Sequence, residues 1–135
     1  MEALNILYVG EAQHSRLHAA LERDLAQVNV MTPETLHEAL AMYVLYFPDV
    51  IVFEGCSELV REVFYHLSSG VTQFTPQQVE SMVIVADGER WHAPQNTILK
   101  QIPANSDFNA LVWAIEDVRA QSEAQIVAAH QREMA

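Results

Sequence analysis

The sequence has one cysteine and seven basic residues among 135, and it has no long apolar run. Because a disulfide needs two thiols and a multi-cysteine metal site needs several, Cys56 alone excludes both within this chain. No window approaches the roughly 20 apolar residues of a transmembrane helix. The opening MEALNILYVG lacks the basic start of a secretory signal. We therefore expect a cytoplasmic protein.

Positive charge is scarce relative to negative charge. Eighteen acidic residues face seven lysines and arginines, which gives a net charge of −11 at pH 7. A surface with this excess repels the phosphates of nucleic acids and the headgroups of anionic lipids. The charge therefore predicts protein partners, with no binding to nucleic acid or membrane.

Glycine is also rare, with four in the chain. The segment GEAQHS, after the first apolar run, has one glycine and cannot form a glycine-rich phosphate loop. Cys56 could be a nucleophile, but its apolar setting in FEGCSEL favours a small buried side chain. His14 and His18 lie four residues apart without a third ligand nearby. No nucleophile, base and orienting group occur together, so we expect no enzymatic activity.

The chain does contain a regular alternation of apolar runs and helical periods. This alternation is typical of a parallel sheet covered by helices. We expect helix caps at Thr32, Ser57 and Ser106, with Val44 and Phe47 among the core residues of the second helix. The expected strands are residues 5–9, 28–31, 50–53, 82–85 and 97–102.

The order predicts an α/β fold with a doubly wound, flavodoxin-like sheet of five parallel strands in the order 2-1-3-4-5. Only about a dozen residues separate the last two strands, so the fourth helix should be short or missing. The last helix should be long. We assign residues 1–120 to the domain and 121–135 to a helical extension, whose heptad positions Ser122 and Gln125 do not favour a coiled coil.

Two segments resemble the receiver domain of response regulators. NILYVGEAQHSRLHAALE is similar to the start of a receiver, and PDVIVFEG is similar to the segment that carries its phosphoacceptor aspartate. The resemblance implies an acidic pair for Mg²⁺, the aspartate, a hydroxyl residue and a lysine before a proline. The corresponding positions here are Gly10-Glu11, Glu54, Ala86 and Ile102, with Lys100 two residues earlier.

These substitutions predict a degenerate receiver, or pseudo-receiver, that is not phosphorylated. Phosphoryl transfer depends on positioning and charge neutralisation, and a misplacement of about 1 Å can cost ~10²-fold in rate. Glu54 is then either a fixed mimic of phosphoaspartate or a leftover carboxylate, and we favour the second. Glu11, Glu54 and the Cys56 carbonyl could hold Mg²⁺ with low affinity; we expect no other cofactor.

The resemblance also directs attention to the surface around the missing helix, which receivers commonly use for output and dimerisation. Trp91 and His92 lie there, and Trp113 lies on the last helix. We expect a non-catalytic protein-interaction module of a two-component-type system, acting as a homodimer through its last helix and the adjacent face. The alternative is a flavodoxin-like domain that binds a small ligand or nucleotide at the strand ends.

Overall fold

The computed structural model describes residues 4–10, 16–24, 27–68, 80–88, 90–93 and 97–134. The strands are β1 (Leu4–Val9), β2 (Val28–Met31), β3 (Val50–Glu54), β4 (Glu80–Val85) and β5 (Thr97–Ile102). The helices are α1 (Arg16–Asp24), α2 (Leu36–Tyr46), α3 (Glu58–Ser68) and α4 (Phe108–Met134).

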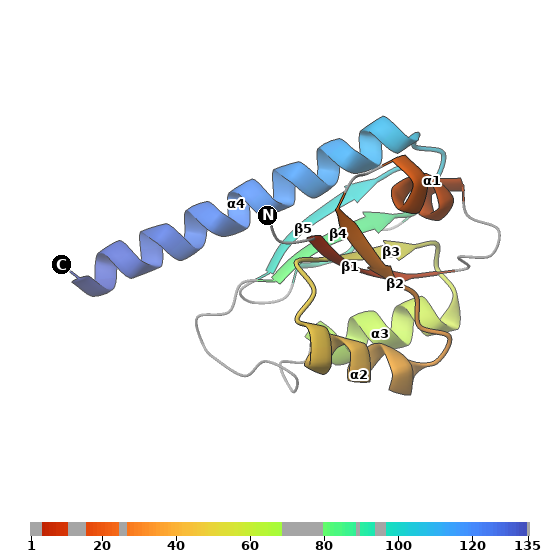
Figure 1. Cartoon of the computed structure of the whole chain (residues 1–135), viewed down its shortest axis with the longest axis horizontal. Coiled ribbons are helices and arrows are strands. Elements are labelled where there is room, and N and C mark those ends of the chain that lie inside the picture. The colour runs from red at the N-terminus through yellow and green to blue at the C-terminus, as the bar shows by residue number, and fades with distance from the viewer. Residues whose placement is uncertain are drawn as a thin grey trace.

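All five strands are parallel and lie in the order β2-β1-β3-β4-β5. This order confirms the predicted doubly wound, flavodoxin-like fold. Figure 1 shows α1 and α4 on one face of the sheet and α2 and α3 on the other. Each face carries its own buried cluster, because successive residues of a strand point to opposite sides. Because all five strands are parallel, their carboxyl ends lie at one edge of the sheet. A functional site is expected at that edge.

The connection from β4 to β5 forms no helix in its described residues, 86–88 and 90–93. The short spacing predicted this. Gln101, on β5, holds both ends of the described loop. Its amide nitrogen donates to the Ala86 carbonyl at 3.1 Å, and its amide oxygen accepts from the Trp91 backbone N–H at 3.1 Å. The Gln101 side chain thus ties the described part of this connection to β5.

Two helix caps differ from the sequence prediction. The N-cap of α2 is Thr35 rather than Thr32, and its hydroxyl accepts from the Glu38 backbone N–H at 3.1 Å. Both Thr32 and Thr35 suit a cap, but Glu38 stands three residues after Thr35 and favours it. Asp107 caps α4, accepting from the Ala110 N–H at 2.8 Å. Ser106 instead bonds the Pro103 carbonyl. The Ser57 cap is confirmed, at 3.3 Å from the Val60 N–H.

The end of α2 is more exposed than its apolar pattern predicted. Ala39 and Tyr43 are buried, whereas Val44 and Phe47 are 39% and 60% exposed. Phe47 is the C-cap in the left-handed conformation, and its N–H donates to the Tyr43 carbonyl. The chain therefore leaves the helix at Phe47, and the predicted core positions at this end face outward.

Strand β4 begins two residues earlier than predicted, at Glu80. Glu80 is 5% exposed and accepts a hydrogen bond from the hydroxyl of buried Tyr43. Burial raises the pKa of the Glu80 carboxyl, and the bond from Tyr43 opposes that rise. A buried carboxyl at the start of a strand is costly without such a partner.

The last helix, α4, has 27 residues and is continuous through residue 120. Its inner face packs on the sheet through Leu111, Ala114, Ile115 and Val118, and Ser122 is the last buried side chain among those described. Figure 1 shows the second half of α4 extending beyond the sheet. Within the described part of the chain, no helix combines the length and apolar character needed to cross a membrane.

Candidate functional site

Gly10 and Glu54 stand side by side at the carboxyl ends of β1 and β3. A Cβ atom at Gly10 would lie 2.8 Å from the backbone oxygen of Glu54 and 3.1 Å from its Cβ. Contacts this short to a backbone atom force a shift of the chain. Position 10 therefore cannot carry the carboxylate that a receiver has there unless the backbone moves.

Glu54 itself makes a specific contact inside the domain. The Tyr8 hydroxyl donates to its Oε1 atom, and the Tyr8 ring is fully buried between the sheet and its helices. The His18 ring of α1 packs edge-on against Tyr8, with ring centroids 5.1 Å apart. The Glu54 carboxylate is thus held by a core side chain, whereas an acceptor carboxylate must be free to attack.

Ala86 and Ile102, at two further positions of the receiver pattern, also have structural roles. Ala86 has no hydroxyl; its backbone N–H donates to the Ile102 carbonyl at 3.1 Å. Ile102 is 8% exposed and belongs to the core cluster beneath α1 and α4. Neither side chain can contact a phosphoryl oxygen by a hydrogen bond.

Lys100 does not replace the missing lysine. It pairs with Val83 in the sheet, two residues before the end of β5, and its amine lies 2.9 Å from Asp117 Oδ2 on α4. The bond from Lys100, with a second from Gln121, lowers the pKa of the Asp117 carboxyl. The lysine is therefore bound to the last helix, away from the strand ends.

The predicted magnesium ligands are described only in part. Glu11 lies outside the described residues, as does His14. Glu54 and Cys56 line a cavity of about 340 Å³ together with Gly55 and Ser57. Cys56 is exposed, contrary to prediction, because it lies in the turn between β3 and α3. Among the described residues no group of three His, Cys, Asp or Glu side chains could hold a metal, and the Glu11 site stays a prediction.

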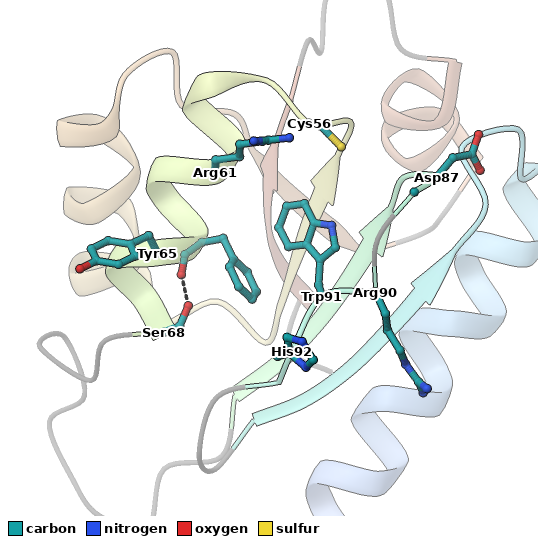
Figure 2. A pocket seen from close by; sticks show the side chains of 10 residues that line it. Cys56, Arg61, Tyr65, Ser68, Asp87, Arg90, Trp91 and His92 are labelled. Carbon is teal, nitrogen blue, oxygen red and sulfur yellow. Dashed lines mark hydrogen bonds between the residues drawn. The ribbon is translucent and has the colours of Figure 1, made fainter.

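A cavity of about 540 Å³ lies beside Trp91, and we call it the Trp91 cavity. Trp91 is half-buried, and its ring centroid lies 4.7 Å from that of Phe64 and 6.2 Å from that of Phe53. Figure 2 shows the indole between α3 and the β4–β5 connection. The lining residues are Cys56, Arg61, Phe64, Tyr65, Ser68, Asp87, Gly88, Arg90, Trp91 and His92.

Two of the three predicted surface residues lie at this cavity. Trp91 and the exposed His92 both line it, whereas Trp113 is 74% exposed on α4. The sequence prediction missed Arg61 and Phe64. Phe64 belongs to the apolar stripe of α3, and the spacing of that stripe does not indicate a cavity beside it.

Comparison with known proteins identifies the fold. No family model and no curated protein matches the sequence. A receiver domain protein (CheY-like) from Methanospirillum hungatei matches in structure with a TM-score of 0.60 and 16% identity, over 92% of this chain and 99% of that one. The N-terminal domain of an uncharacterized protein from Wolinella succinogenes matches with a TM-score of 0.62 and 16% identity, over 91% and 99%. The chain has the fold of CheY-like receivers.

A third similar structure includes the long last helix in its coverage. It is a fusion containing the trimeric coiled coil of yeast Spc42, amino acids 181–211. It matches with a TM-score of 0.61 and 14% identity, over 99% of this chain and 95% of that one. At these identities the likeness concerns the fold alone.

Proposed function

We propose that this chain is a non-catalytic, phosphorylation-independent receiver-like module that acts by protein contacts in a two-component-type system of the cytoplasm. The observation that carries the proposal is the close approach of Gly10 to Glu54, with the Glu54 carboxylate held by Tyr8. The fold is retained while the space for a second metal-binding carboxylate is filled by backbone. Glu54 then has a structural role rather than that of a phosphoaspartate mimic.

The loss of four parts together argues against a phosphorylation switch. A receiver needs Mg²⁺ and fixed donors around the transferring phosphoryl group, because catalysis there is positioning and charge neutralisation. Here Ala86 has no donor on its side chain, Ile102 is buried, and Lys100 is bound to Asp117. The remaining function of such a fold is to present surfaces.

The outer face of α4 is the surface best suited to a second copy of the chain. Trp113, Ala120, Ala124 and Val127 are all exposed, and their spacing of seven, four and three residues places them on one stripe. Trp113 and Val127 are 74% and 54% exposed. This stripe, which we call the outer stripe, lies opposite the buried residues Leu111, Val118 and Ser122.

The outer stripe differs in register from the positions considered in the sequence. Ser122 is buried against the domain, so the polar heptad through Ser122 and Gln125 continues the inner face. The outer stripe, in contrast, is apolar from Trp113 to Val127. Figure 1 shows that the second half of α4 extends beyond the sheet. Two such stripes would bury each other in a homodimer. The similarity to a fusion with a coiled coil is in keeping with this proposal.

Sedimentation over a concentration series, with and without a small phosphodonor and Mg²⁺, tests the proposed function. We expect twice the mass of one chain under both conditions. A chain that stays monomeric throughout, or that dimerises only with the phosphodonor, would contradict it.

A further inference from the structure

The Trp91 cavity lies beside the connection between β4 and β5, whose described residues form no helix. Its volume, about 540 Å³, falls in the range of small-molecule sites. Phe64 from α3 and Trp91 from the loop form an aromatic wall and pack edge to face, with 4.7 Å between their ring centroids and 76° between their planes. The Gln101 side chain fixes the Trp91 backbone, so the aromatic wall is held in place before any ligand arrives.

The polar groups at this wall are mainly donors. Neither the Arg61 guanidinium nor the Trp91 indole N–H has an acceptor among the residues that the structure describes. Figure 2 shows Arg61 extending from α3 toward Cys56, on the same side of the loop as the indole, whereas Arg90 points to the opposite side. Asp87, the one described acid at the cavity, accepts from the Ala104 N–H at 3.1 Å and points away.

A positive side chain faces the aromatic wall, although the chain as a whole is acidic. Arg61 lies on the indole side of the cavity, whereas Arg90 and Asp87 line it but point away, in a protein of net charge −11. A guanidinium near an aromatic wall favours a planar ligand with a carboxylate, because Arg binds carboxylates in a two-point fork. An aromatic ring in the ligand can make edge and face contacts with Trp91 and Phe64, which stabilise the complex beyond the burial of apolar area.

We infer that the Trp91 cavity binds a small planar aromatic carboxylate, with its ring against Trp91 and Phe64 and its carboxylate at Arg61. This inference goes beyond the interaction function. It stands whether or not the chain dimerises, because the cavity lies on α3 and the β4–β5 connection rather than on the outer stripe of α4. Such a ligand would contact the connection between β4 and β5.

The two tryptophans provide the test. In a ¹H–¹⁵N correlation spectrum of the full chain, the Trp91 and Trp113 indole N–H groups give separate peaks, which a Trp113→Phe variant assigns. We expect 2-naphthoate to move the Trp91 peak in a saturable way and to leave Trp113 unchanged. The neutral analogue 2-naphthamide should bind about tenfold more weakly, since it lacks the charge-assisted bond.

Matched variants locate the carboxylate. Arg61→Gln should weaken 2-naphthoate binding by about tenfold or more, whereas Arg90→Gln should change it by less than about threefold. Arg61 is exposed, so its replacement should leave the core intact, and unchanged backbone amide peaks from the buried strands check the fold. No saturable movement of the Trp91 peak, or equal affinity in Arg61→Gln and wild type, would overturn the inference.

Discussion

The backbone of Glu54 occupies the space into which a side chain at Gly10 would point, with 2.8 Å between the Glu54 oxygen and an added Cβ. This relationship favours a glycine directly after β1, at the position where the resemblance to receivers implies an acid. The two residues are compatible with each other: β3 pairs with β1, and the Glu54 side chain accepts a hydrogen bond from Tyr8.

Gly10→Ala should destabilise the domain, because the new methyl group meets backbone rather than a flexible side chain. We expect a loss of about 1–3 kcal/mol in the free energy of unfolding, as for other overpacked sites. Urea unfolding followed by circular dichroism measures it. A change below about 0.5 kcal/mol, the usual size for a surface substitution, would mean that the backbone at β1 and β3 moves apart easily.

Tyr8→Phe and Glu54→Ala should show coupled effects on stability. Their hydroxyl–carboxylate bond joins a buried ring to a strand end. In a double-mutant cycle we expect an interaction energy of about 1.5 kcal/mol, at the low end for hydrogen bonds to charged groups. Additive single effects would show that Glu54 is a free, solvated carboxylate, and the structural role proposed for it would be wrong.

Glu80→Gln should change the pH dependence of stability. Burial raises the pKa of Glu80 in the folded state, so the folded chain holds that proton more tightly than the unfolded chain. Stability therefore falls as pH rises from the unfolded toward the folded pKa, and the loss persists above it. Glutamine carries no charge, so the stability of the variant relative to wild type should increase as pH rises above the ordinary glutamate pKa of 4.5.

Urea midpoints over a series of pH values measure the effect of Glu80→Gln. Glu62→Gln, at an exposed position of α3, is the matched control for replacing a glutamate. If Glu80→Gln and Glu62→Gln gave parallel curves, the buried carboxyl would not govern the pH dependence.

Val127→Glu should convert the proposed dimer to a monomer. It places a charge in the outer stripe of α4, where Val127 is 54% exposed. An unpaired charge in a helix–helix contact costs several kcal/mol, which weakens association by about a hundredfold or more. Gln125→Glu adds a similar charge on another side of the same helix and should leave the mass unchanged. Equal sedimentation of the two variants would exclude the outer stripe as the interface.

Much of the fold could be predicted from the sequence because parallel strands are buried on both faces. Runs such as VIVF and MVIV leave little ambiguity, and the short gap before β5 predicted the missing helix. The errors arose where several residues were equally suitable. Thr32 and Thr35 both suit a cap, and only Glu38 distinguishes them. Val44 and Phe47 lost their predicted core positions where α2 ends.

For the candidate site, the sequence predicts only which residues of the receiver pattern are absent. The sequence shows that Gly10, Glu54, Ala86 and Ile102 depart from the receiver pattern, but not that Glu54 would bind Tyr8. That contact joins residues 46 positions apart and depends on the register of β1 against β3. The Trp91 cavity could not be predicted either. Arg61 and Phe64 belong to an ordinary amphipathic helix, and their spacing alone does not indicate that they line a cavity.

Intact mass after incubation with acetyl phosphate and Mg²⁺ tests the central claim most directly, with a phosphorylatable receiver in parallel as the positive control. We predict that the mass of the wild-type chain stays unchanged while the control gains one phosphoryl group. A gain of one phosphoryl group by the wild-type chain that disappears in Glu54→Gln would contradict the account.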